Sequence, residues 1–300
     1  MQKRIALILI CTCMVTNRVL AADKQNSYWL LFEQGNAAMD AKEFGQALKL
    51  YQEAILQAGI FPEAEMAIGE VYLEEGETAL AIAQYEKAYT IRNAFYIPEM
   101  QYDVLYKLAH IYETQELYKK MEDALIQITN DDSHFVESTT LKLRTQIEKN
   151  FLEKGLDRVL VLYAFEDSFS AAAHSKLGWF YYRTGRFSQS VPHLLYSIIY
   201  RATRMEQYLK ERDVDFQFSS LQDLLEIVDK NQDLRKYAEE SGFYADLYYI
   251  AAATFANGYP QSSSVLWKLI SGFPAAGKYQ ELSKSQLKSP RIEPLLNISQ

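Results

Sequence analysis

Small and aromatic residues recur at three- and four-residue steps along residues 28–94, which is the spacing of one face of an amphipathic helix. The stretch GNAAMDAKEFGQALKLYQEA aligns with GEVYLEEGETALAIAQYEKA after a shift of 34 residues. The shift places Gly35 on Gly69, Ala47 on Ala81, Tyr51 on Tyr85 and Ala54 on Ala88. Each unit therefore predicts a helix, a short turn and a second helix. We expect the small residues to let the two helices approach closely and the tyrosine to fill the gap between them.

This 34-residue spacing resembles the tetratricopeptide repeat. Pro62 stands where a first-turn proline opens a helix, at the start of the second unit. The first unit departs from the family pattern in carrying Ala38 where the second unit has Tyr72. The resemblance implies an all-α fold, a superhelical solenoid of antiparallel helix pairs.

Weaker copies of the first helix follow at LYKLAHIY (105–112), LGWFYYRTG (177–185) and LYYIAAATFANG (247–258). Ala109 and Gly178 are 69 residues apart, and Gly178 and Ala251 are 73 apart, each close to two periods. Each gap is therefore expected to hold one diverged helix pair. The predicted pairs are 137–151 with 156–166, and 216–229 with 231–240. The chain then has about five to seven repeats, several of them degenerate. An unrelated all-α bundle after residue 95 is the alternative.

The chain begins with MQKR, an apolar run from Ile5 to Val15 and a small-residue exit, which is the pattern of a secretory signal peptide. Cleavage is expected after Ala21 or Ala22, and an uncleaved anchor is the alternative. Both cysteines, Cys11 and Cys13, lie inside the apolar run without the small residues that lipid attachment requires. A mature chain without cysteine suits a bacterial periplasm, so we expect an exported bacterial protein.

Four regions follow from these patterns. Residues 1–22 form the signal peptide, 23–130 the N-terminal repeats, 131–275 the degenerate repeats and 276–300 a capping helix with a flexible tail. The helix is expected near 277–288, where it caps the apolar end of the last repeat, and the remainder is expected to fray.

Composition and charge exclude several classes of protein. Of the 300 residues, 49% are apolar, enough for a large core, so a disordered chain is excluded. The formal net charge of −8 argues against nucleic acid as a partner. No stable membrane span is expected once the signal peptide is removed.

No catalytic motif accompanies the repeats. The sequence has no Gly-rich phosphate loop, nucleophile elbow or zinc-protease helix, and its four histidines lack metal-ligand spacing. His134, beside Asp131 and Asp132, is interpreted as part of a polar loop. Asp229, Asn231, Asp233 and Glu240 have the oxygen spacing of an EF-hand, but Leu234 replaces its glycine, so a turn and a charged helix are predicted. We expect no enzyme activity, metal or cofactor.

In proteins of the resembling family, the first helix of each repeat lines a concave groove. Transferred by resemblance, this assigns ten groove residues here: Trp29, Phe32, Asn36, Met66, Glu70, Tyr106, His110, Trp179, Tyr182 and Tyr248. The set is aromatic, methionine-bearing and acidic, which favours an apolar or basic protein segment as partner. Phe32 and Glu70 stand where a carboxylate clamp needs amide or basic groups, so no such clamp is expected.

The resulting hypothesis is an exported, non-enzymatic scaffold or adaptor that binds a protein segment in the cell envelope. One alternative is a periplasmic carrier of a small apolar ligand, which would need an apolar cavity closed at both ends. A second is a helical accessory domain of a cell-wall enzyme system, which a convergent carboxylate or histidine cluster would favour.

Overall fold

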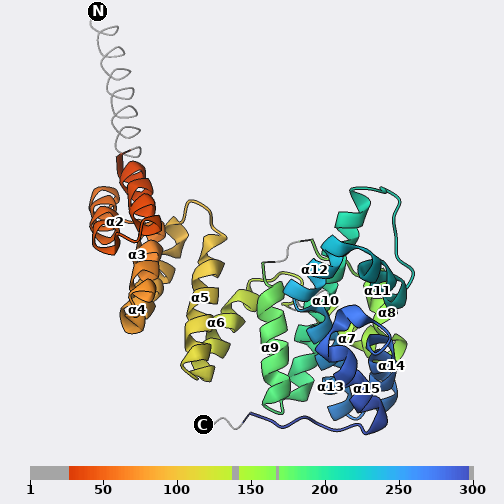
Figure 1. Ribbon diagram of the computed structural model, residues 1–300. Coiled ribbons are helices and arrows are strands. Elements are labelled where there is room, and N and C mark those ends of the chain that lie inside the picture. The colour runs from red at the N-terminus through yellow and green to blue at the C-terminus, as the bar shows by residue number, and fades with distance from the viewer. Residues whose placement is uncertain (1–26, 137–141, 167–168, 297–300) are drawn as a thin grey trace, which may run out of the picture. The chain divides into compact units, whose positions relative to one another are not determined.

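The computed structural model describes residues 27–136, 142–166 and 169–296 (Figure 1). The predicted signal peptide lies outside these residues. Within the described ranges every regular element is a helix and no strand is present. The helices pack in consecutive pairs, which confirms the all-α prediction. No helix in these ranges has the length and apolar character needed to cross a membrane.

The chain forms two compact units, Met1–Leu117 and Tyr118–Gln300. Unit 1 holds a helix over residues 27–40, then α2 (Phe44–Ala58), α3 (Pro62–Glu74), α4 (Thr78–Thr90), the 3-10 turn η1 (Arg92–Ala94) and α5 (Met100–Thr114).

Unit 2 begins one helix earlier than the boundary predicted after residue 130, because α6 packs against α9. Its elements are α6 (Tyr118–Asn130), α7 (Leu143–Lys154), α8 (Leu156–Leu162), α9 (Ala171–Arg183), α10 (Phe187–Lys210), α11 (Leu221–Lys230), α12 (Gln232–Glu240), α13 (Phe243–Ala256), α14 (Pro260–Ile270), η2 (Pro274–Ala276) and α15 (Lys278–Lys288).

One backbone turn recurs at five places between helices that follow each other in the chain, four of them within a unit and one, at Glu116, between α5 and α6. Its central residue has a positive φ, and the next amide donates to a carbonyl five residues back, as Glu77 N does to Tyr72 O. The central residues are Lys42, Gly76, Glu116, Gly185 and Gly258. Five copies of one turn therefore place the repeat throughout both units.

Glycine lets the two helices of a pair approach closely, as the sequence predicted. A Cβ built on Gly69 would lie 2.8 Å from the Tyr85 ring, and one on Gly35 would lie 2.5 Å from the Tyr51 ring. Gly178 repeats the arrangement with Leu194 as the filling side chain, at 2.5 Å. These distances are too short for a methyl group, so the side chain of the second helix occupies the space that glycine leaves.

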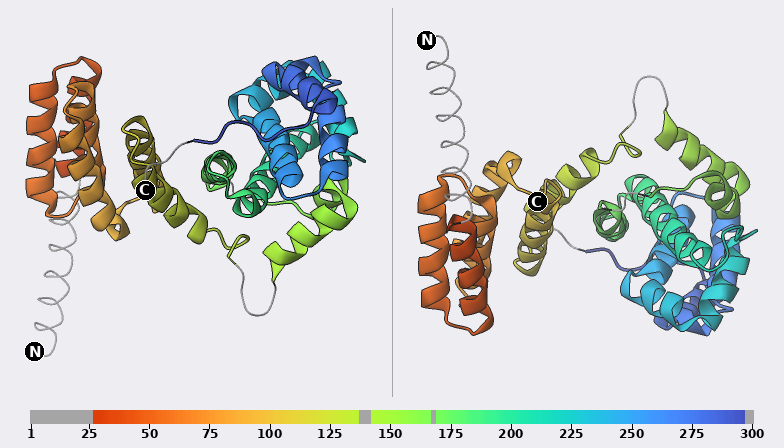
Figure 2. Two further views of the ribbon diagram at one scale, coloured as in Figure 1. Left: turned by 90° about the horizontal axis from the view of Figure 1, so that it is seen from below. Right: turned by 90° about the horizontal axis from the view of Figure 1, so that it is seen from above.

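The two diverged helix pairs form, but they do not occupy repeat positions in the stack. α6 packs directly on α9, and the α9–α10 pair packs directly on α13. The hairpin α7–α8 packs against α10 instead, and α11–α12 packs against α8, α13 and η2 (Figures 1 and 2). Neither hairpin has the shared turn, since the α7–α8 link is Gly155 and the α11–α12 link is the extended Asn231. The two-period gaps in the sequence are therefore insertions beside the stack.

The C-terminal region contains the predicted cap followed by an ordered segment. α15 packs on α13 and α14, as a terminal helix of a repeat array should. Beyond it, the described residues 289–296 do not fray as predicted. They run extended and hydrogen-bond to the helices of unit 2.

Candidate functional site

The aromatic groove residues at the start of unit 1 pack against their neighbours. Trp29 and Phe32 are half-buried, with ring centroids 4.8 Å and 5.2 Å from that of Phe61, which precedes α3. The ring of Tyr96 lies 6.0 Å from Trp29. This aromatic cluster joins the first helix to α3, so Trp29 and Phe32 contribute to stability as well as to the surface.

Two polar residues of the predicted groove hold the repeats together. The Tyr51 hydroxyl donates to Asn36 Oδ1 at 2.9 Å, across the first helix pair. Glu70 of α3 accepts an ion pair from Lys107 of α5 at 2.5 Å. Both oxygens are therefore engaged within unit 1.

Three further predicted residues lie on the first helices of two successive repeats. Met66 of α3 and Tyr106 of α5 are half-buried, and His110, one turn beyond Tyr106, is exposed. Residues 27–117 carry fifteen acidic and five basic side chains, a net charge of −10, whereas the whole chain has −8. The negative charge of this protein is therefore concentrated on unit 1.

In unit 2 the groove prediction was wrong for two residues. Tyr182 of α9 is 0% exposed and Tyr248 of α13 is 1% exposed, whereas Trp179 is half-buried beside Arg183. The two tyrosines are buried partly because residues 290–296 lie over them. The sequence carried no signal for this covering segment.

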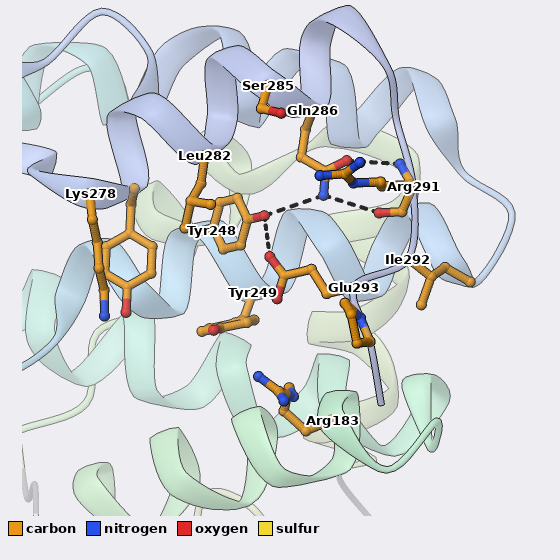
Figure 3. Close-up of a pocket in the computed structure, with 12 residues that line it drawn as sticks. Arg183, Tyr248, Tyr249, Lys278, Leu282, Ser285, Gln286, Arg291, Ile292 and Glu293 are labelled. Atoms are coloured by element: carbon orange, nitrogen blue, oxygen red, sulfur yellow. Dashed lines mark hydrogen bonds between the residues drawn. The ribbon is translucent and has the colours of Figure 1, made fainter. Parts of the chain in front are cut away.

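Hydrogen bonds fix the C-terminal segment over these helices (Figure 3). The Tyr248 hydroxyl donates to Glu293 Oε1 at 2.5 Å, and Glu293 N donates to the Tyr182 hydroxyl at 3.2 Å. Gln286 of α15 both accepts from Arg291 N at 2.9 Å and donates to Arg291 O at 3.0 Å. Leu296 N donates to the carbonyl of Arg183 at 2.7 Å. Residues of α9, α13 and α15 thus hold one extended segment of the chain.

A cavity of about 700 Å³ lies beside this segment. Three helices and the segment line it. The lining residues are Arg183 of α9, Tyr248 and Tyr249 of α13, residues 291–294, and, from α15, Lys278, Tyr279, Leu282, Ser285 and Gln286. Burial first, and then the Glu293 carboxylate, raise the pKa of Tyr248. Burial likewise raises the pKa of Tyr182 to about 12, so both hydroxyls stay protonated and able to donate. With Arg183, Lys278 and Glu293 in its wall, the cavity differs from the closed apolar one that a carrier of apolar ligands needs.

A second polar centre surrounds Asp132, in the loop that the sequence interpreted as merely polar. Its Oδ2 accepts hydrogen bonds from Ser170 at 2.7 Å and Tyr200 at 2.6 Å, and its Oδ1 accepts from His134 N at 2.8 Å. His174 Nε2 lies 3.3 Å from Oδ2. Burial alone would raise the pKa of Asp132, but the bonds from His174, Tyr200 and Ser170 outweigh it and hold that pKa well below its usual range. The carboxylate is ionised and ties the loop to α9 and α10.

Two buried histidines continue this network. His174 Nδ1 and His193 Nδ1 are 3.0 Å apart, so one imidazole donates to the other. If His174 carries its proton on Nε2, toward Asp132, its Nδ1 accepts from His193, and both rings are neutral. Burial lowers the pKa of both rings, and the positive charge of Arg144 lowers both pKa values further. The Asp132 carboxylate raises the pKa of His174 and so opposes part of this effect.

The stability of unit 2 is expected to fall as the pH drops from about 7 to about 5. A histidine whose folded pKa lies below its unfolded value of about 6.5 takes up a proton first in the unfolded state. The stability present above pH 6.5 is therefore lost progressively below that pH, by about 1–3 kcal/mol for two such rings. Urea unfolding at several pH values, followed by tryptophan fluorescence in a Trp29→Phe background, measures unit 2 alone because Trp179 and Trp267 remain there.

His174→Gln/His193→Gln is expected to lower stability at every pH and to flatten this slope. His110→Gln, which changes an exposed histidine of unit 1, provides the matched control and should leave the slope unchanged. An equal slope in the double variant would show that other groups cause the pH dependence.

The geometry of the Asp132 centre fits a structural role better than a catalytic one. Asp132, Ser170 and His174 are each at most 1% exposed, so a solute cannot reach them in the folded state. The Ser170 hydroxyl is 0% exposed and donates to the carboxylate, so it is not placed to attack a substrate. Within the described ranges, no group of three or more His, Cys, Asp or Glu residues is placed to hold a metal ion.

The residues with EF-hand-like spacing form a turn and the start of α12, as predicted. The Asn231 side chain caps α12 by accepting from Asp233 N and Leu234 N at 3.0 and 3.1 Å. The Asn231 oxygen therefore serves the backbone, whereas Asp233 accepts from the Tyr208 hydroxyl and Glu240 pairs with Lys236.

Comparison with known proteins identifies a known repeat within unit 1. Residues 32–95 match the family model described as a tetratricopeptide repeat, and they span the first two helix pairs. Tetratricopeptide repeat domains generally serve as scaffolds for protein interactions.

Two spirochete relatives extend over more of the chain. A protein of Borreliella burgdorferi is 25% identical over 298 residues, covering 90% of this chain and 92% of the relative. A protein of Treponema pallidum is 25% identical over 222 residues, covering 72% of this chain and 58% of the relative. Both are described as uncharacterized proteins, so they assign no function.

Proposed function

We propose that this protein is an exported, non-enzymatic adaptor of the bacterial cell envelope, which binds a basic or apolar protein segment on unit 1. The observation that carries the proposal is the surface formed by the first helices of unit 1. Met66, Tyr106 and His110 lie on successive first helices, within residues 27–117, whose net charge is −10.

The charge defines the partner more sharply than the aromatic residues do. A strongly negative surface raises the rate at which a basic segment associates, and salt screens the attraction. Asp40, Glu74 and Asp103 are exposed on the three first helices of unit 1 and can receive lysine or arginine side chains. Met66 and Tyr106 then offer adaptable apolar contacts to the same segment.

Crosslinked capture from intact bacterial cells tests this proposal with the full chain as bait. Met66→Ala/Tyr106→Ala/His110→Ala is expected to reduce capture of the partner by about tenfold or more, because hot-spot side chains dominate such interfaces. The captured segment should be basic, and raising the salt from about 0.05 M to about 0.5 M should weaken its binding to the purified chain.

Leu56→Ala/Leu80→Ala provides the matched control. It removes exposed apolar side chains from the second helices, α2 and α4, and should leave capture unchanged. Capture that survives the triple variant would reject this surface. The intact mass of the recovered chain tests export, since cleavage after Ala21 or Ala22 removes the predicted signal peptide.

A further inference from the structure

The C-terminal segment, residues 290–296, is held chiefly through its main chain. The amides of Arg291, Glu293 and Leu296 all donate to groups of the helices, and the carbonyl of Arg291 accepts from Gln286. Bonds to the main chain fix the path of a peptide without requiring a particular sequence. The surface formed by α9, α13 and α15 is therefore a site for an extended chain.

One side chain of the segment is recognised specifically. The Glu293 carboxylate receives the Tyr248 hydroxyl, and the guanidinium of Arg183 and the ammonium of Lys278 belong to the same cavity wall (Figure 3). Leu295 follows two residues later and covers Gly185, where a built Cβ would lie 3.3 Å from Leu295 Cδ1. The site thus recognises the glutamate, and Leu295 lies over Gly185 while remaining 47% exposed.

Little apolar area holds the segment in place. Ile292 is 44% exposed and Leu295 is 47% exposed, and Pro294 between them is exposed as well. The segment follows the last helix, so its departure breaks a few hydrogen bonds and leaves every helix intact. Segments with few buried contacts open at low free-energy cost.

We propose that the surface of α9, α13 and α15 is a binding site for an extended peptide of another protein with a glutamate followed by proline and an apolar residue. Residues 290–296 occupy this site in cis. A partner segment of the same chemistry displaces them and gains the rest of the cavity, including Lys278 and Tyr279. This site lies in unit 2 and goes beyond the basic-segment surface proposed for unit 1, so either can fail without the other.

Fluorescence anisotropy with a labelled peptide of residues 289–296, SPRIEPLL, tests the proposal. The peptide is expected to bind a chain that ends at Ser289 at least about tenfold more tightly than the full chain, since a tethered segment competes at an effective concentration near millimolar. Replacing the glutamate in the peptide (Glu293→Gln) should weaken binding to the shortened chain roughly tenfold, because a charge-assisted hydrogen bond is lost.

The peptide with Ser289→Ala is the matched control and should bind within about twofold of the parent, because Ser289 is exposed and lies outside the cavity wall. Equal affinity for the full and shortened chains, no binding to a shortened chain that keeps its helical circular dichroism, or indifference to Glu293→Gln would overturn the proposal.

Hydrogen exchange on the full chain keeps the proposal testable should the shortened chain fail to fold. Tyr248→Phe removes the donor to Glu293, so the amides of Arg291, Glu293 and Leu296 are expected to exchange about tenfold faster, while those of α13 keep their protection. Unchanged exchange in the segment would reject Tyr248 as its holding group and, with it, the site.

Discussion

Replacing Asp132 by alanine is expected to lower the free energy of unfolding of unit 2 by about 3–5 kcal/mol. The carboxylate is 1% exposed and accepts bonds from Ser170, Tyr200 and the His134 amide. Alanine leaves these buried donors without an acceptor and opens a cavity between the loop, α9 and α10. Because the low pKa of Asp132 keeps the group ionised in the folded state, its contribution is present above its ordinary pKa near about 4 and is lost as the pH falls further.

Urea unfolding of the Trp29→Phe background at neutral pH measures this effect. Asp131→Ala is the matched control, since the neighbouring carboxylate is exposed, and it should change stability by less than about 0.5 kcal/mol. A similarly small effect of Asp132→Ala would mean that water replaces the carboxylate and that the loop does not depend on it.

Breaking the buried ion pair of Arg201 and Asp246 is the second large effect that we expect. Arg201 of α10 is 5% exposed and bonds Asp246 of α13, which is 2% exposed and also accepts from Ser175 of α9 at 2.6 Å. Arg201→Met leaves a buried carboxylate without its cation, which should cost about 3–5 kcal/mol.

The double variant Arg201→Met/Asp246→Leu should recover a large part of this loss, because two apolar side chains of similar size replace a pair whose desolvation is costly. The same urea titration measures both variants, and Arg204→Met on the exposed side of α10 is the control. A double variant no more stable than Arg201→Met would show that the pair is a net stabiliser.

The sequence predicted local features of the fold well, because they depend on residues close together in the chain. Gly35 with Tyr51 and Gly69 with Tyr85 are close contacts within one helix pair, and their spacing alone identifies them. The cap α15 was predictable in the same way, from a polar helix after the last repeat.

Long-range packing accounts for what the sequence did not predict. The 69- and 73-residue gaps have the length of extra repeats, and only the contacts of α6 with α9 and of α9–α10 with α13 show that the inserted hairpins lie beside the stack. Asp132 meets Ser170, His174 and Tyr200 across 38 to 68 residues of sequence. Tyr182 is covered by a segment that follows more than a hundred residues later, and no motif marks that contact.

The length of α10 determines where this array can change. It has 24 residues, against 13 in its partner α9, or roughly 36 Å against 20 Å at about 1.5 Å per residue. On the overhanging half, Thr203 accepts a hydrogen bond from Phe165 N, in the segment that follows α8, and Tyr208 donates one to Asp233 of α12. Residues can therefore be gained or lost in either hairpin at the flank of unit 2, while the spacing of α6, α9 and α13 stays the same. The long helix therefore offers the inserted hairpins a surface beside the stacked helices.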